Sequence, residues 1–182
     1  EANKSSTPTP CREALKEMFK LIISSDEATV QTAIQQFKDH YFTLRPDQIA
    51  FPRGANNITG CIERRTYRTQ GGEQVTVESY KKGTPIHVRA ALAYNWQRRD
   101  LNLKQYPELR NGDKLKFLYL KPGKFKENVI AFPDFLPKEF NLEQHIDKEL
   151  QFQKTFTDAI EPILNAIGWT SIKVNSLEDF FG

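Results

Sequence analysis

Cationic side chains gather in the central part of this 182-residue sequence. Residues 53–126 contain 16 Lys and Arg against 6 Asp and Glu, a local excess of +10, although the whole chain carries only +3. Residues 127–182 carry −6 and residues 1–52 carry −1. A surface that contacts a polyanion such as nucleic acid requires a basic segment of this kind. The alternative is a solvated surface on which the charges cluster by chance.

Two Thr-Pro pairs that follow lysines predict helix starts with phosphate-binding chemistry. In Lys4-Ser5-Ser6-Thr7-Pro8-Thr9-Pro10 and in Lys81-Lys82-Gly83-Thr84-Pro85, Thr9 and Thr84 are suited to the N-cap. The proline after each suits the first helical position, where its missing N–H costs nothing. A helix N-terminus beside lysines offers an anion both backbone N–H groups and positive charge.

Residue patterns of catalytic sites are missing from the sequence. Gly71-Gly72 lacks the Lys-Ser/Thr that would complete a phosphate loop, and no serine stands in a nucleophile elbow. No close carboxylate pair of the kind used in metal-dependent phosphoryl transfer is present. The histidines and cysteines lack the spacing of metal ligands: His40, His87, His145, Cys11 and Cys61. We therefore expect this segment to hold neither an active site nor a cofactor.

The C-terminal residues Ser176 to Gly182 form an apolar tail. Leu177, Phe180 and Phe181 would share one side of a helical turn, at positions i, i+3 and i+4. This arrangement is typical of a short peptide that inserts into a hydrophobic pocket of a partner protein. The alternative is that the tail folds back and covers the core of its own chain.

Composition bounds the remaining possibilities. Apolar residues make up 38% of the chain, enough for a folded core, and no run approaches the roughly 18 residues that cross a bilayer. Two cysteines are too few for a disulfide framework and favour a reducing, intracellular setting. The sequence begins without Met, so we expect it to be a piece of a longer protein.

Hydrophobic periodicity predicts an α+β fold that is predominantly helical, with small β hairpins and a long C-terminal helix. A hairpin is expected where Thr66–Thr69 and Val75–Val77 flank Gln70-Gly71-Gly72-Glu73. Pro162 should kink or restart the C-terminal helix, and Gly168 should end it. The other expected elements are helices at about 10–23, 25–41, 85–99 and 142–167 and strands at 114–121 and 128–132.

Three segments resemble, in the same order, the C-terminal region of family B replicative DNA polymerases from T-even-type tailed phages. They are Lys4–Pro8, Gly83–Asn95 and the tail Ser176–Gly182, with weaker similarity at Ala55–Ile58, Ile130–Pro133 and Lys154–Phe156. The resemblance spans almost the whole chain, and its most specific element is the His-x-Arg block around His87. The segment from Cys61 to Tyr80 has the character of an insertion relative to the family pattern. The tail ends Phe-Phe-Gly, where the phage relatives usually continue with acidic and aromatic residues.

The resemblance implies a thumb domain over residues 1–175 and a clamp-binding peptide at 176–182. In this bacteriophage family the thumb grips newly made primer–template duplex during DNA replication, and the tail docks to a sliding clamp. The catalytic carboxylates and their Mg²⁺ lie upstream in the palm, so this chain is expected to be a non-catalytic part of a DNA-directed DNA polymerase, a nucleotidyltransferase. The implied partners are duplex DNA, the clamp and the palm portion, with no membrane, in the cytoplasm of an infected bacterial host.

A duplex grip without sequence preference uses phosphate and sugar contacts. For each lysine the alternative is an ordinary solvated side chain, and for Arg89 it is an ion pair with the acidic C-terminal helix. Tyr94 and Trp96 are expected in the core, because gripping duplex needs no stacking platform. The expected DNA-binding residues are Lys4, Ser5, Ser6, Asn56, Asn57, Lys81, Lys82, His87, Arg89, Lys121, Lys126 and Lys154, and the clamp-binding residues are Leu177, Phe180 and Phe181.

Two other functions stay open on the sequence alone. One is an independent duplex-binding accessory protein that ends in a partner-binding peptide. The other is a small enzyme whose site has no recognisable motif. An adjoining palm-encoding reading frame would favour the polymerase over the accessory protein, and nucleotidyl transfer by the isolated chain would favour the enzyme.

Overall fold

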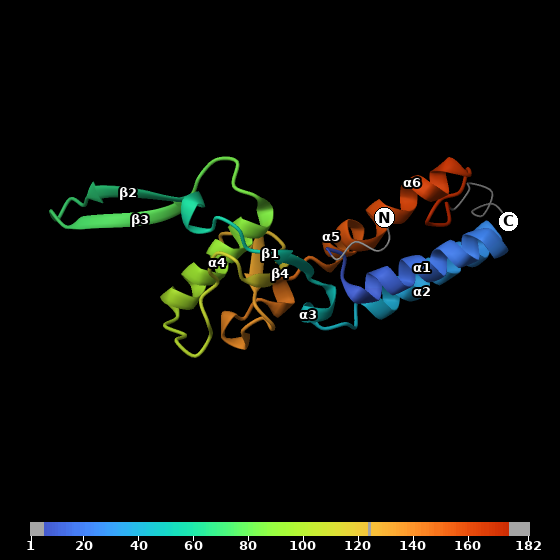
Figure 1. Ribbon diagram of the computed structural model, residues 1–182, viewed down its shortest axis with the longest axis horizontal. Coiled ribbons are helices and arrows are strands. Elements are labelled where there is room, and N and C mark those ends of the chain that lie inside the picture. Colours follow the sequence, from blue (N-terminus) through green and yellow to red (C-terminus); the bar gives the residue numbers. More distant parts are fainter. Residues whose placement is uncertain (1–5, 124, 175–182) are drawn as a thin grey trace, which may run out of the picture. The chain divides into compact units, whose positions relative to one another are not determined.

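The computed structural model describes residues 6–123 and 125–174, and the chain forms two compact units (Figure 1). One unit comprises Glu1–Phe51 and Lys148–Gly182, and the other comprises Pro52–Asp147. The predicted α+β class is confirmed, with more helix than strand and small antiparallel sheets. Lys4, Ser5 and the tail residues Leu177, Phe180 and Phe181 lie outside the described residues.

Helices build the first unit around an apolar core. Its elements are α1 (Thr9–Ser24), α2 (Glu27–Tyr41), α3 (Pro46–Ile49), α5 (Lys148–Phe152) and α6 (Asp158–Ala166). The Asp26 side chain accepts a hydrogen bond of 2.8 Å from the Thr29 backbone N–H, which caps α2 close to its predicted start. Tyr41 from α2 and Phe156 from the C-terminal part of the unit are fully buried. Long-range packing of amphipathic faces therefore holds the unit together.

The C-terminal helix begins later than its periodicity predicts. Leu142 to Asp147 form a 3₁₀ turn and an extended stretch, in which Ile146 bridges Leu120. The Asp147 backbone N–H donates to the Tyr119 carbonyl, so strand pairing competes with helix here. A π-helical segment, Gln153–Thr157, separates α5 from α6, and this irregularity ends one turn before Pro162. Gly168, at φ +77°, ends α6 as predicted, with the Trp169 N–H donating to the Leu164 carbonyl.

Neither predicted threonine cap forms. Helix α1 has Pro8 at its N-cap with Thr9 already inside the helix, and α4 (Ile86–Asp100) has Pro85 at its N-cap. The Thr84 hydroxyl donates to the Lys81 carbonyl at 2.7 Å instead, closing the turn before the helix. Each predicted capping threonine stands one residue away from the position that its hydroxyl would need in order to cap.

In the second unit, helix α4 packs on a three-stranded sheet. The strands are β1 (Phe51–Gly54), β4 (Lys114–Tyr119) and β5 (Val129–Phe132), in the order β1-β4-β5, and β4 and β5 are antiparallel. All four residues of β5 are buried. Small residues on α4, Ala90, Ala91 and Ala93, are also buried and let the helix approach the sheet closely.

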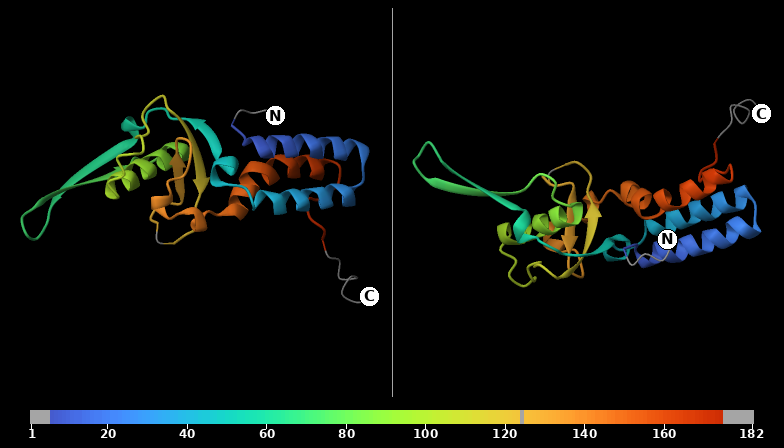
Figure 2. Two further views of the ribbon diagram at one scale, coloured as in Figure 1. Left: turned by 90° about the horizontal axis from the view of Figure 1, so that it is seen from below. Right: turned by 45° about the horizontal axis from the view of Figure 1, so that its top comes forward.

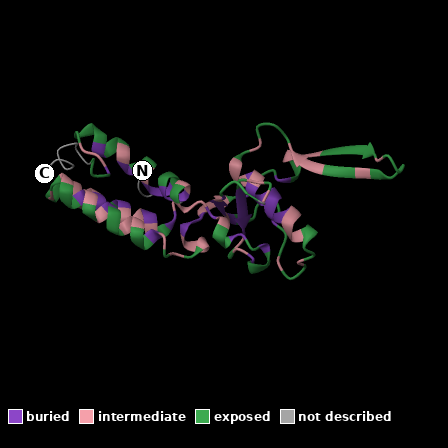
Figure 3. Ribbon diagram, turned by 180° about the vertical axis from the view of Figure 1, so that it is seen from behind, coloured by how far each residue is buried: buried purple, intermediate pink, exposed green. Residues whose placement is uncertain are grey.

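The predicted hairpin forms a two-stranded ribbon from β2 (Ile62–Arg68) and β3 (Gln74–Tyr80). The Thr69 N–H donates to the Glu73 carbonyl at 2.8 Å, and Gly72 takes φ +82° in the connecting loop. The ribbon extends away from α4 and the three-stranded sheet of the same unit (Figures 1 and 2). Its distal part is mostly exposed on both faces (Figure 3).

Candidate duplex-binding surface

The two units differ in charge. The unit at residues 52–147 holds 17 Lys and Arg against 11 Asp and Glu, an excess of +6. The other unit holds 9 against 12, which gives −3 and accounts for the total of +3. The basic segment predicted from sequence, residues 53–126, falls wholly inside the positive unit. A polyanion is therefore attracted to this unit first.

Two of the predicted DNA-binding segments meet in this unit. The Lys81 side-chain Nζ donates to the Gly60 carbonyl at 2.8 Å, and the Lys81 backbone N–H donates to the Cys61 carbonyl at 2.9 Å. These bonds hold the turn that carries Lys81 and Lys82 against Gly60 and Cys61, a few residues after Asn56 and Asn57. All four of these predicted residues are exposed.

A second loop fixes the backbone of residues 55–60. The Ile58 N–H donates to Asn111 Oδ1 at 2.6 Å, and the Ala55 N–H donates to the Asp113 carbonyl at 2.7 Å. Asn57 takes a left-handed conformation, φ +55°, and its side chain lies over Gly60. A Cβ at position 60 would fall 2.0 Å from Asn57 Oδ1, so a larger residue there would displace the Asn57 side chain. The bonds from Ile58 and Ala55 fix the backbone that carries the exposed Asn57.

Lys82 lies just before the N-terminus of α4. Its side chain is exposed, and the described residues offer its ammonium no partner. Gly83 takes φ +83°, which turns the chain into the helix. The Val88 and Arg89 N–H groups donate to the Pro85 carbonyl at 3.0 Å, so the N–H groups of Ile86 and His87 are the helical donors that remain for an anion near the lysine cation.

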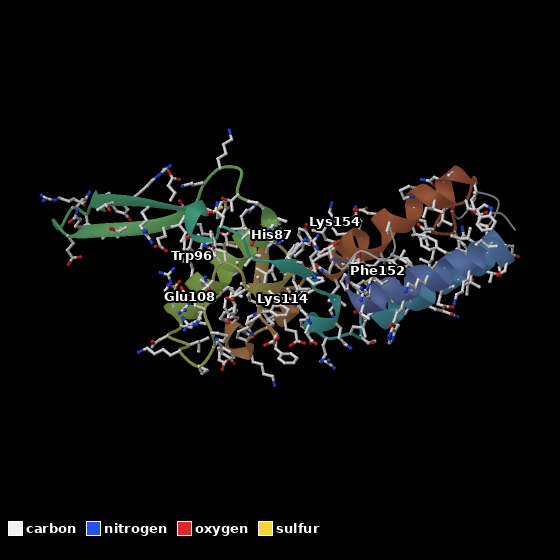
Figure 4. The ribbon with its side chains drawn as sticks, viewed as in Figure 1. His87, Trp96, Glu108, Lys114, Phe152 and Lys154 are labelled. Atoms are coloured by element: carbon white, nitrogen blue, oxygen red, sulfur yellow. The ribbon has the colours of Figure 1, made fainter. Side chains whose placement is uncertain are left out.

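His87 and Arg89 on α4 are less accessible than these lysines. His87, labelled in Figure 4, is half-buried, and both its burial and the nearby Arg53 charge lower its pKa. This environment favours the neutral ring, which can donate or accept a hydrogen bond. The Arg89 guanidinium lies 4.6 Å from the centre of the Tyr80 ring and donates to Asn128 Oδ1 at 3.1 Å.

Arg89 also forms an ion pair, although with a different partner from the one considered in the sequence. Its Nη2 lies 4.0 Å from Glu127 Oε2, in the loop before β5, and its side chain is only 26% exposed. These contacts join α4 to the end of β3 and to that loop. The geometry favours a structural role for Arg89 over a phosphate contact.

The remaining predicted residues are divided between the units. Lys121 and Lys126 are exposed on the second unit, and Lys126 lines a groove of about 760 Å³ together with Trp96 and Arg99. Ser6 and Lys154 belong to the first unit, where Lys154 Nζ lies 3.8 Å from Asp158 Oδ2 (Figure 4). Eight of the ten described candidates therefore lie on one unit.

A cluster around Glu78 was not foreseen from the sequence. Glu78 accepts hydrogen bonds from Arg64 Nε at 2.9 Å, from Trp96 Nε1 at 3.0 Å and from Arg99 Nη2 at 3.0 Å. Burial of Glu78 by itself raises its pKa, but these three donors outweigh it and the pKa is lowered. Tyr94 is buried as expected, whereas Trp96 is only half-buried and lines the groove. The hairpin loop fixes Arg64 opposite Glu78, so that pair was the one signal available in the sequence.

No group of three or more His, Cys, Asp or Glu side chains able to hold a metal ion occurs among residues 6–123 and 125–174. None of the helices in this described part is long and apolar enough to cross a membrane. No protein-family model matches the chain, and no curated protein matches it in sequence.

Proposed function

We propose that this chain is the thumb portion of a DNA-directed DNA polymerase and that the unit at residues 52–147 grips primer–template duplex through phosphate contacts. The observation that carries the proposal is that Lys81 bonds to Gly60 and Cys61. These bonds tie the exposed Lys81–Lys82 turn before α4 to the segment that carries the exposed Asn56 and Asn57, on the unit that holds the positive charge. Exposed lysines, amide side chains and helical N–H groups are the donors that bind phosphate without reading bases.

The resemblance to family B phage polymerases is a second argument for the same function, and it comes from the sequence. Its most specific block, Gly83–Asn95, coincides with the turn before α4 and most of that helix. Catalysis then belongs to an upstream palm, and the missing active-site patterns fit that division. On this proposal the tail residues Leu177, Phe180 and Phe181 dock into a pocket of a sliding clamp.

A salt titration tests the duplex grip. We expect the isolated chain to bind primer–template duplex weakly and without sequence preference. If roughly four to six phosphates are neutralised, log K should fall with log salt at about −0.9 per phosphate. An affinity that is the same at low and at physiological salt contradicts the proposal.

Lys82→Ala tests the position of the grip, and Lys16→Ala is its matched control. Both lysines are exposed and have no ion pair among the described residues, but Lys16 lies on α1 of the negative unit. We expect Lys82→Ala to reduce the salt slope by about 1 on every sequence alike, and Lys16→Ala to leave it unchanged. Equal effects of the two variants would mean that the contact is not localised.

The alternative is a stand-alone accessory protein that binds duplex by the same surface. Adding the upstream polymerase portion distinguishes the two functions. A thumb should restore primer extension to a palm fragment that lacks it, whereas an accessory protein should bind duplex but leave that fragment inactive. Nucleotide incorporation by this chain alone would refute both.

A further inference from the structure

The β2–β3 ribbon, an insertion relative to the polymerase pattern, carries a surface to which the proposed grip gives no role. Its strands are seven residues long, which corresponds to about 23 Å at the usual rise. An isolated two-stranded hairpin is only marginally stable in water. The distal part of this long ribbon is exposed on both faces, so it offers surface that is not used in packing within this unit.

The root of the ribbon is fixed to α4. Glu78 on β3 accepts from Trp96 and Arg99 of the helix, and Tyr80 lies under the Arg89 guanidinium. The Lys81 N–H continues the pairing with the Cys61 carbonyl. These contacts hold the ribbon at its base and leave its distal half free to meet a partner.

The two faces of the ribbon differ in chemistry. Residues opposite one another in the antiparallel register share a face. On one face Tyr67 and Val77 are exposed at 54% and 43%, and Arg65 is paired with Glu63. We call the other face, at its distal end, the polar tip face; it consists of Thr66, Arg68, Gln74 and Thr76.

The polar tip face has the chemistry of a phosphate-binding surface. It contains four hydrogen-bonding side chains and no carboxylate, and all four residues are exposed. The Arg68 guanidinium has no partner among the described residues, whereas Arg64 and Arg65 nearer the root are ion-paired. Glu78, the one carboxylate on this side of the two strands, is held by three donors.

We infer that the polar tip face of the ribbon is a second contact with duplex DNA, through the sugar–phosphate backbone. This inference rests on the proposed duplex grip, which it extends along the same unit from Lys81 and Lys82 at the ribbon's base. The major groove, about 12 Å wide, admits a two-stranded β-ribbon. The ribbon side chains provide one free cation and neutral donors, which suits a phosphate contact better than base reading.

Arg68→Gln and Arg65→Gln form a matched pair for testing the inference on the full chain. Both remove one positive charge from β2, but from opposite faces of the ribbon. We expect Arg68→Gln to weaken binding of a fluorescent 20-base-pair duplex roughly tenfold at low salt and to reduce the salt slope by about 0.9. Arg65→Gln should leave the duplex affinity and the salt slope within twofold of their values for the unchanged chain.

Thr66→Val together with Thr76→Val supplies a charge-neutral test. The two hydroxyls lie 2.9 Å apart across the strands, and valine keeps both shape and strand propensity. We expect a weaker affinity with an unchanged salt slope. Equal losses of duplex affinity from Arg68→Gln and Arg65→Gln, or no loss from either, would overturn the inference. A loss from Arg65→Gln alone would also overturn it, because the duplex contact would then lie on the opposite face of the ribbon.

Failure of the inference and failure of the proposed function give different results. If the unchanged chain shows no salt-dependent binding, the duplex grip itself is refuted. If the chain binds and Lys82→Ala weakens it while Arg68→Gln does not, only the ribbon contact is refuted.

Discussion

Replacing Glu78 by Gln should loosen the attachment of the ribbon to α4. Trp96 Nε1 and Arg99 Nη2 share Oε2, so the glutamine oxygen can accept from both, but its NH₂ group then faces Arg64 Nε and the negative charge is lost. Arg64 and Arg99 are 66% and 48% exposed, so their ion pairs with Glu78 contribute only about 0.2–1 kcal/mol each. Trp96 Nε1 keeps an oxygen acceptor but loses the charge on it, and a hydrogen bond to a charged group is worth about 1 kcal/mol more than a neutral one. We expect a total loss of about 2 kcal/mol.

Each unit carries one of the chain's two tryptophans, Trp96 or Trp169, so each unfolding transition has its own reporter. In a Trp169→Phe background, Trp96 fluorescence during urea denaturation measures the stability of the second unit. Glu63→Gln is the matched control, because among the described residues Glu63 pairs with the exposed Arg65 alone, on the other face of the ribbon. That variant should lose less than about 0.5 kcal/mol. Equal losses from the two variants, or a loss below 0.5 kcal/mol from Glu78→Gln (about the control's value), would refute the Glu78 attachment.

The structure makes three further predictions. Burial opposes ionisation of Glu78, but its hydrogen bonds outweigh burial and lower its pKa. The stability that Glu78 contributes is therefore present above the unfolded pKa of about 4.3 and is lost as pH falls through the lower folded value. The stability of the second unit, followed by Trp96, should drop on acidification, and less so in Glu78→Gln. Burial raises the Cys11 pKa to about 11, so Cys11 should react slowly with iodoacetamide at pH 8. Mass spectrometry should find Cys61 modified and Cys11 intact, and rapid labelling of both would contradict the packing of α1. Gly168→Ala places a side chain at φ +77° and should lower the free energy of unfolding of the first unit by about 1 kcal/mol. Trp169 fluorescence in a Trp96→Phe background measures this loss, and no loss would contradict the left-handed cap.

Locally determined features were predictable from the sequence. The Gln70-Gly71-Gly72-Glu73 loop specified the hairpin, and Gly168 specified the end of α6, because each depends on a few neighbouring residues. The charge of residues 53–126 likewise identified the segment that forms most of the positive unit.

Features set by distant contacts were not predictable. Residues Leu142–Asp147 have helical periodicity, but the pairing of Ile146 with Leu120 keeps their backbone out of the helix. Charge alone could not separate Lys82, which is exposed and unpaired among the described residues, from Arg89, whose guanidinium lies between Tyr80 and Asn128. Tertiary packing decides which cationic side chains stay exposed. The sequence could therefore predict the segment that forms the candidate surface but not its individual residues.

Lysine acetylation with and without duplex DNA, followed by mass spectrometry, tests the proposed grip most directly. The account predicts that duplex protects the exposed lysines of the positive unit, Lys82 and Lys126, and leaves Lys16 on α1 fully reactive. Protection should disappear at high salt, where the phosphate contacts are screened. Protection of Lys16 equal to that of Lys82, or no protection of Lys82 under conditions where duplex is bound, would contradict the proposal that the unit at residues 52–147 holds the DNA.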